Sequence, residues 1–306
     1  MLESTKQRYL KLAANFYRTR MNGAALSTSN IRSALINAAP SYRPDYFRVL
    51  KNALAFDVRE RGYSAAAEKI LKIQNPTTQP ESTLPVKAKR PSAKALSEDD
   101  FRTLCCHLGE PGKAHVFAAV ILAWHLGVRP SEMHQIRVEG EHFYITGAKK
   151  DDTGIRGADR ILMLPDPDDS SLVADAVDLY NSTRRSLGAT RDTLREQCRL
   201  LWPRRKVQPT LKSLRHQLGS NLKASGLAPE TMAYIMGHQS TRSIERYGDK
   251  RLAHKGNRSL PSPAPRADTS KVRVRSSGKP AWHSAVTATK NEPLPPPTQQ
   301  TKRHST

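Results

Sequence analysis

The chain has 306 residues, 37% of them hydrophobic, which is enough for one or two globular domains with buried cores. Its 50 lysines and arginines outnumber its 28 aspartates and glutamates, so the formal net charge is +22. An excess of this size indicates a polyanionic partner, with nucleic acid as the first choice and an anionic membrane surface as the second. No apolar run reaches the roughly 20 residues that span a bilayer. Three cysteines, Cys105, Cys106 and Cys198, lack metal-ligand spacing, and the N-terminus lacks a secretory signal, so we expect a reducing cytoplasmic setting.

Residues 1–75 are predicted to form a helical domain whose polar faces are basic. Four apolar residues at intervals of three and four line one face of a helix: Phe47, Leu50, Leu54 and Val58. Gly62 is expected to end that helix, and Ser64 to cap the next one. The following residues, 76–95, hold four prolines and no periodic apolar pattern, which is typical of a linker.

A second domain is predicted over residues 96–255. Ser97 followed by Asp100 is similar to a helix capping box, with aspartate in place of the usual glutamate. Residues 114–127 are apolar nearly all round, which predicts a helix in the core of this domain.

Short β-like runs interrupt the helical pattern of the second domain between residues 136 and 164. They read QIRV, HFYIT and RILML, with polar or glycine-containing turns between them, and they predict a small antiparallel sheet. Helical patterns then resume and end with a short helix from about residue 241 to 250. The expected fold class is therefore mainly α with a small antiparallel β-sheet.

The composition changes at residue 256. Residues 256–306 contain eight prolines, and their nine lysines and arginines face only two acidic residues. Such a segment buries too little apolar surface to offset the entropy of ordering it, so we expect a disordered basic tail. Its charge favours non-specific phosphate contacts, and a solubilising role is the alternative.

Several residues suited to phosphate chemistry follow one another along the second domain. They are Arg129 in GVRPSE, Lys149 and Lys150 in ITGAKK, Arg215 in SLRH, His238 in GHQS, and Tyr247 nine residues after that histidine. Taken singly, each has an ordinary structural role, such as a solvated lysine, a helix cap or a tyrosine packed at a helix end. Their order and spacing together make coincidence implausible.

This arrangement resembles the catalytic domain of the tyrosine recombinase (phage integrase) family. The family has an arginine after a glycine-ended helix, a lysine on a β-hairpin, a His-x-x-Arg-His segment, a Gly-His pair and a nucleophilic tyrosine. In this chain Lys149 follows Arg129 by 20 residues, and His238 follows Arg215 by 23. The spacing of 23 and the nine residues from His238 to Tyr247 are usual for the family, and Lys149 falls in the expected hairpin. The resemblance is strong over residues 115–250 and weak before residue 95.

The resemblance implies DNA strand cutting and rejoining through a 3′-phosphotyrosyl intermediate. Tyr247 would attack the phosphodiester, and the guanidinium forks of Arg129 and Arg215 would bind the non-bridging oxygens as charge develops on them. Lys149 would give a proton to the leaving 5′ oxygen, and His238 would hydrogen-bond the phosphate. No step needs a metal or a nucleotide, so no cofactor is expected. Glu132 is expected to orient an arginine or to cap a helix.

Two lysines leave questions open. Lys149 and Lys150 point in opposite directions on a strand, so only one can face the phosphate, and Lys149 is favoured because it follows the strand directly. Lys212 stands where the family usually has histidine, three residues before the second arginine. Lysine binds phosphate but is a poor base at neutral pH, so Lys212 is expected to change how the tyrosine is activated. It also keeps two alternatives open, a type IB topoisomerase and a non-catalytic DNA-binding protein.

The same resemblance implies an architecture and a set of partners. Residues 1–75 would be a helical core-type DNA-binding domain, and residues 96–255 a mixed α/β catalytic domain that closes with it around DNA. The partners would be double-stranded DNA at a recombination site, other copies of the chain in a homotetramer on two DNA sites, and an accessory DNA-bending protein. No membrane partner is expected, and the protein would act in the cytoplasm at the nucleoid.

Overall fold

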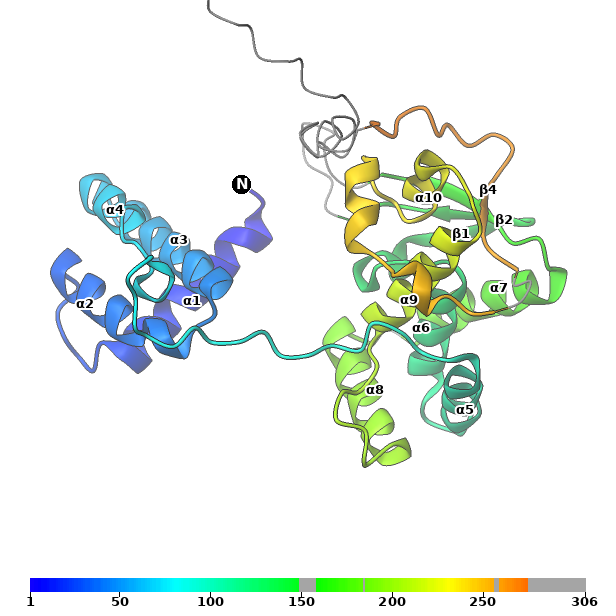
Figure 1. Cartoon of the computed structure of the whole chain (residues 1–306), viewed down its shortest axis with the longest axis horizontal. Helices are drawn as coiled ribbons and strands as arrows, with labels where there is room; N and C mark the ends of the chain where they lie inside the picture. Colours follow the sequence, from blue (N-terminus) through cyan, green and yellow to red (C-terminus); the bar gives the residue numbers. More distant parts are fainter. Residues whose placement is uncertain (149–157, 184, 256–258, 275–306) are drawn as a thin grey trace, which may run out of the picture. The chain divides into compact units, whose positions relative to one another are not determined.

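The computed structural model describes residues 1–148, 158–183, 185–255 and 259–274, which form two compact units. The first unit comprises residues 1–91 and the second begins at residue 92 (Figure 1). Each has its own hydrophobic core. The fold class predicted from the sequence, mainly α with a small antiparallel sheet, is confirmed.

The first unit is a group of helices packed around a small core. Its helices are α1 (Glu3–Arg20), α2 (Thr28–Ala38), α3 (Pro44–Glu60) and α4 (Ser64–Leu71), with short 3-10 turns η1 (Ala39–Ser41) and η2 (Pro76–Thr78). The predicted apolar face of α3 is buried in this core together with Phe16, Ile31 and Ile70. Ser64 is the first residue of α4 rather than its cap, because Tyr63 takes the cap position directly after the turn at Gly62, whose φ is 91°.

The second unit is built from six α-helices and a sheet among the described residues. The helices are α5 (Glu98–Leu108), α6 (Ala114–His125), α7 (Pro167–Ser182), α8 (Leu187–Leu201), α9 (Leu211–Ala224) and α10 (Pro229–Ile235). The Ser97 side chain caps α5 by accepting a hydrogen bond from the Asp100 backbone at 3.1 Å, as the sequence predicts. Helix α6 is buried along almost its whole length, so the predicted core helix is confirmed.

A four-stranded antiparallel sheet lies beside these helices, in the order β1-β2-β3-β4. Its strands are β1 (Ile136–Glu139), β2 (His142–Ile145), β3 (Arg160–Met163) and β4 (Ser262–Pro263). The first three coincide with the predicted β-like runs. Their alternation places Phe143, Ile145 and Leu162 in the core.

Strand β4 was not predicted, because it lies within the segment expected to be disordered. That expectation is wrong for residues 259–274. The backbone N–H of Ala264 donates to the carbonyl of Ile161 at 3.0 Å, and Val272 is buried in the core of the second unit. Residues 275–306 lie outside the described part of the chain.

The predicted last helix is also different in the structure. Residues Thr241–Arg246 form the 3-10 turn η4, and Lys250–Leu252 form a second one, η5. Tyr247 lies between them with extended backbone angles, φ −115° and ψ 130°. The nucleophile candidate is therefore held on an extended link and not on an α-helix. In the described ranges, no helix has the length and apolar character needed to cross a bilayer.

Candidate active site

Helix α9 positions Arg215 at the centre of the site. Thr210 and Ser213 form a reciprocal capping box at its start. Leucines at a helical spacing anchor it in the core: Leu211, Leu214, Leu218 and Leu222. The anchored face carries Arg215 with it, and only 2% of that residue is exposed.

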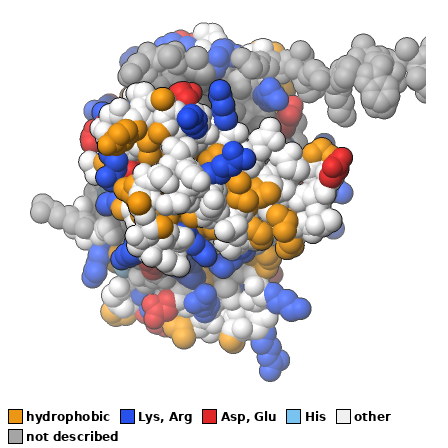
Figure 2. All heavy atoms as spheres, turned by 90° about the vertical axis from the view of Figure 1, so that its left-hand side faces the viewer, with side chains coloured by type: hydrophobic (Ala, Val, Ile, Leu, Met, Phe, Trp, Pro, Cys, Tyr) orange, Lys and Arg blue, Asp and Glu red, His pale blue; other side chains and the backbone are white. Residues whose placement is uncertain are grey.

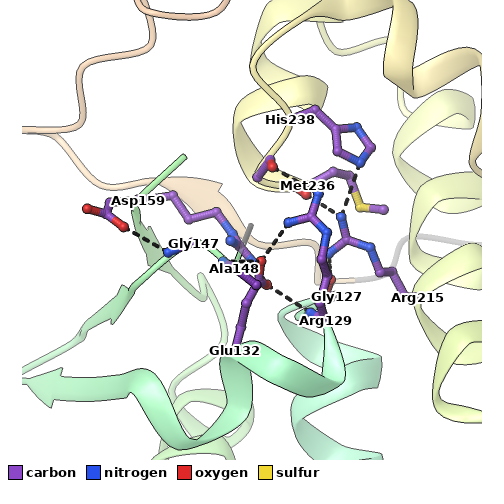
Figure 3. A network of polar contacts seen from close by, with 11 residues as sticks. Gly127, Arg129, Glu132, Gly147, Ala148, Asp159, Arg215, Met236 and His238 are labelled. Atoms are coloured by element: carbon purple, nitrogen blue, oxygen red, sulfur yellow. Dashed lines mark hydrogen bonds and ion pairs between the residues drawn. The ribbon is translucent and has the colours of Figure 1, made fainter. Parts of the chain in front are cut away.

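The guanidinium of Arg215 is fixed by backbone carbonyls before any ligand binds. It donates to the carbonyls of Gly127 and Met236, and one of its nitrogens lies 3.2 Å from Nε2 of His238 (Figure 3). Burial lowers the pKa of Arg215, and the positive charges of Arg129 and Arg160 lower it further. A guanidinium held this way keeps its position when an anion approaches, which removes one cost of binding it.

Arg129 follows the end of α6, where Gly127 turns the chain with a φ of 58°. A side chain at Gly127 would collide with Leu218. The Arg129 guanidinium donates to the carbonyl of Gly237 at 3.0 Å and to Oε1 of Glu132 at 2.6 Å. Its side chain is 18% exposed, so it faces the outside of the site while Arg215 lies beneath.

Glu132 is a fully buried carboxylate that joins three parts of the site. One oxygen accepts from the Arg129 backbone at 2.8 Å, which caps the 3-10 turn η3 (Pro130–Gln135), and also pairs with Arg160 at 2.9 Å. The other accepts from the backbone of Ala148 at 3.2 Å. Burial alone would raise the pKa of Glu132, but Arg160, Arg129 and Arg215 outweigh it and lower that pKa to about 2. Both roles predicted for Glu132, orienting an arginine and capping a helix, are confirmed.

Arg160 was missed by the sequence reasoning. It begins β3, its side chain is fully buried, and it pairs with Glu132. Gly237, with a φ of 59°, leaves room for it, because a Cβ there would lie 2.4 Å from a guanidinium nitrogen of Arg160. Its one sequence signal was a charged residue at the start of an apolar β-like run.

His238 is a neutral histidine whose tautomer follows from its neighbour. A guanidinium has only donors, so Nε2 of His238 accepts from Arg215 and Nδ1 carries the proton. Burial and the nearby charge of Arg215 lower the pKa of His238 to about 2. Among the described residues Nδ1 has no acceptor, which leaves one buried N–H donor ready for a ligand.

The ring of Tyr247 lies against the side chains of His238, Arg215 and a second histidine, His216. Its centroid is 4.9 Å from that of His238, 4.8 Å from that of His216 with the rings stacked, and 5.1 Å from the guanidinium carbon of Arg215. The structure therefore brings together four of the predicted residues, Tyr247, Arg129, Arg215 and His238.

The chain around Tyr247 is tied to one face of α9. The Gly248 backbone N–H donates to Nδ1 of His216 at 3.3 Å, and the Asp249 N–H donates to the Ser220 hydroxyl at 2.9 Å. Lys223 donates to the Gly248 carbonyl at 3.1 Å. These three contacts lie at successive turns of α9, so they hold the link beside Tyr247 along the helix axis.

A pocket of about 480 Å³ opens beside Tyr247. It is lined by Arg129, Pro130, Ser131, Arg191, Leu194, Arg195, Pro209, Thr210, Leu211, Lys212, Arg215 and Tyr247. The predicted Lys212 is exposed at the start of α9 and lines this pocket with the two motif arginines. Two further cations, Arg191 and Arg195 of α8, were not singled out from the sequence, where they read as an ordinary polar helix face.

The hairpin lysine candidates, Lys149 and Lys150, lie outside the described residues. The structure does fix the point from which they follow. Ala148 donates to Glu132, and the Gly147 backbone donates to Oδ1 of Asp159 at 2.8 Å (Figure 3). Within the described part of the chain, no three His, Cys, Asp or Glu side chains group together as a metal site requires.

No protein-family model matches the chain, and no curated protein matches its sequence. Solved structures do match. A lambda integrase tetramer bound to a Holliday junction has a TM-score of 0.57 and 17% identity, covering 84% of this chain and 75% of its own. A lambda integrase dimer bound to a core site has a TM-score of 0.57 and 18% identity, covering 84% and 92%.

The Tn1549 transposon integrase in complex with circular intermediate DNA is also similar, with a TM-score of 0.52 and 14% identity over 81% of this chain and 90% of that one. At these identities the likeness concerns the fold. The chain has the fold of a tyrosine recombinase, with its catalytic-domain fold in the second unit.

Proposed function

We propose that the protein is a site-specific DNA recombinase or integrase that cuts and rejoins DNA through a 3′-phosphotyrosyl intermediate, without metal or ATP. The observation that carries this proposal is the pocket beside Tyr247, where that phenol lies with the guanidinium groups of Arg129 and Arg215. Among the described residues that line it, none is acidic. Such a pocket suits a phosphodiester, because arginines can bind its oxygens and none of these lining residues carries a carboxylate that would repel its negative charge.

The positive charge of the site supports phosphate binding. Arg129, Arg160 and Arg215 surround the single carboxylate of Glu132, so the cluster retains an excess of cations. Arg129 and Arg215 would bind the two non-bridging oxygens, and the Nδ1–H of His238 would add a neutral donor. These groups are fixed by the fold, so they stabilise the charge of the transition state with little rearrangement.

The proposed reaction forms one bond and breaks one in each direction. The Tyr247 oxygen attacks phosphorus and loses its proton to water, the bond to the 5′ oxygen breaks, and that oxygen takes a proton from Lys149 as general acid. Attack by a 5′-hydroxyl of another strand reverses these steps and releases the tyrosine. Lys212 would bind the phosphate as a point charge, and its place in the pocket supports this role.

Features outside the site support double-stranded DNA as the partner. The net charge is +22. The first unit has a hollow of about 360 Å³ lined by Arg32, Lys69 and Lys72 together with polar and apolar residues. On the face shown in Figure 2, lysine and arginine side chains are spread over the surface and acidic ones are few. The first unit would therefore bind DNA in addition to the second unit, which carries the pocket.

The assembly and location belong to the same proposal. The similar lambda integrase structure is a tetramer on a Holliday junction, so we propose a homotetramer on two DNA sites for this chain. An accessory protein that bends DNA would assist it. The protein would work in the cytoplasm at the nucleoid.

The test is covalent capture of DNA. Duplexes retained by the Tyr247→Phe protein from a random-sequence library would be sequenced, rebuilt with a nick near each candidate position, and incubated with wild-type protein without metal or ATP. We expect a protein–DNA adduct that resists denaturation and that Tyr247→Phe does not form. Absence of any adduct on the selected duplexes would sink the enzymatic proposal and leave a non-catalytic DNA-binding protein.

A type IB topoisomerase is the second candidate, and Lys212 in place of the family's histidine is the feature that favours it. The two enzymes differ in their products. Joined strands from two separate duplexes would indicate a recombinase, whereas relaxation of a supercoiled plasmid without such joints would indicate a topoisomerase.

A further inference from the structure

Helix α8 brings two arginines to the pocket that holds Tyr247. Thr190, Leu194 and Cys198 bury one face of α8, and Leu194 also lines the pocket. Arg191 lies one helical turn before Leu194 and Arg195 directly follows it, so the packing of this leucine holds both beside the pocket that they line. Both side chains are exposed, and both line the pocket.

The number of cations exceeds what one phosphate needs. A phosphodiester has two non-bridging oxygens, and Arg129 and Arg215 each offer a planar fork of donors to them. With Lys212, Arg191 and Arg195, five cationic side chains line the pocket. A volume of about 480 Å³ falls in the range of about 300–1,000 Å³ that accommodates drug-sized molecules, so it exceeds a single phosphate.

The two arginines of α8 are also available to bind. Arg195 pairs with Asp192 at 2.8 Å, but both side chains are more than half exposed, and such surface pairs contribute little. A phosphate can therefore replace Asp192 at small cost. Arg191 and Arg195 are four residues apart on the helix, so they lie on one face and can grip a common anion.

We propose that Arg191 and Arg195 bind a second phosphate of the cut strand, one of the two that flank the phosphate attacked by Tyr247. This inference rests on the proposed function of the site. Two phosphates held at once fix the register of the strand, so the scissile phosphate is centred between Arg129 and Arg215. Arg191 and Arg195 are thus positioning residues, which touch the DNA but not the reacting atoms.

The experiment removes the charge of one phosphate at a time. Duplexes with a single methylphosphonate at each position near the cut are compared for adduct formation by wild type and by Arg191→Gln/Arg195→Gln. For wild type, a methylphosphonate at one flanking position should reduce adduct formation about tenfold. On unmodified DNA, the double variant should form adduct about tenfold less than wild type does. A methylphosphonate at that flanking position should not reduce its adduct formation further.

Arg199→Gln is the matched control, because Arg199 is exposed one turn further along α8 and does not line the pocket. Its effect should add to that of every methylphosphonate. Thermal unfolding of each variant checks that α8 remains folded.

A binding measurement separates this inference from the proposed reaction. The same duplex series is titrated with Tyr247→Phe protein carrying or lacking the α8 substitutions, where no cleavage is needed. Loss of the flanking-phosphate effect in the α8 variant supports the inference even if wild type forms no adduct. Equal methylphosphonate effects with and without Arg191 and Arg195 overturn it, whether or not the protein cuts DNA.

Discussion

At the scale of single residues, the candidate site depends on one carboxylate. Glu132 is fully buried and compensates Arg160, which is also buried, and Arg129, which is partly exposed. It caps the turn after Arg129 and holds the backbone at Ala148. Removing its charge leaves guanidinium groups in a protein interior without their partner, a costly arrangement.

We therefore expect Glu132→Gln to lower the free energy of unfolding by about 3–5 kcal/mol, the usual cost of breaking a buried pair on one side. Urea unfolding followed by circular dichroism measures it. Glu139→Gln is the control, because Glu139 forms an exposed pair with Arg137 on β1 and should cost less than about 1 kcal/mol. Equal losses in the two variants would contradict the role given to Glu132.

His238 predicts a pH dependence of stability. Its pKa is lowered to about 2 in the folded protein, against an ordinary value near 6.5, so the unfolded chain binds the proton more tightly. The stability that neutral His238 contributes to the folded protein is complete above about pH 6.5 and is lost as the pH falls toward 2. Below about pH 6 this loss approaches 1.4 kcal/mol per pH unit.

His238→Asn has no group that titrates there, so its stability should fall less steeply between pH 7 and pH 4 than that of wild type. Thermal and urea unfolding of the two proteins without DNA at several pH values gives the comparison. Parallel stability curves would show that His238 titrates normally in the folded state.

The motif residues could be predicted from sequence because their spacing follows the chain itself. Arg160 could not, since its burial depends on Glu132, 28 residues away, and on the missing side chain at Gly237. Arg191 and Arg195 could not either, because an exposed arginine pair on a helix is common. Only the fold places that pair beside Tyr247.

At the scale of elements, the link that carries Tyr247 differs most from the sequence-based expectation. The stretch before it, QSTRSIER, is rich in serine and threonine, which favour turns over regular α-helix. The residues just after Tyr247 are held in place by hydrogen bonds to His216, Ser220 and Lys223 of α9. Propensity alone could not reveal these tertiary contacts, whereas the buried faces of α3 and α6 were visible as periodic apolar patterns.

Gly248 is the tightest point of this link. Its φ is 70°, and a Cβ there would lie 2.3 Å from backbone atoms of Gly219 and Ser220. Gly248→Ala should therefore push Tyr247 away from α9 and lower the rate of adduct formation about tenfold or more, a displacement effect on a positioned reactant.

Gly226→Ala separates strain from collision. Gly226 has a φ of 79° with open space around it, so it shares the conformational cost of about 1 kcal/mol but meets no neighbour. Adduct rates and thermal unfolding are measured for both variants. If Gly226→Ala slows the reaction as much as Gly248→Ala, the close packing of Gly248 on α9 has no special role.

At the scale of the whole molecule, two units with separate cores carry basic surfaces of different kinds. The second unit has the pocket around Tyr247, and the first has the hollow lined by Arg32, Lys69 and Lys72. Phosphate contacts release counterions, so each contact adds to the salt dependence of binding. The two units should therefore contribute separately to that dependence.

Replacing Arg32, Lys69 and Lys72 by glutamine should weaken DNA binding and reduce the slope of log affinity against log salt by up to about 3, roughly 0.9 per phosphate contact. Fluorescence anisotropy with the Tyr247→Phe protein at several salt concentrations measures it. The control replaces three exposed cations of α1 (Arg8, Lys11 and Arg18). If both triple variants lose the same slope, the hollow is not a preferred contact.

The two residues of β4 have a consequence for the solubility of the chain. They occupy hydrogen-bonding positions along β3, which would otherwise be an open sheet edge able to pair with another molecule. Proline at this outermost position also prevents the sheet from growing further. A protein shortened to residue 255 should therefore aggregate, as light scattering on warming would detect, whereas one shortened to residue 274 should stay monodisperse. The start of the basic Pro-rich segment thus protects the sheet edge from self-association.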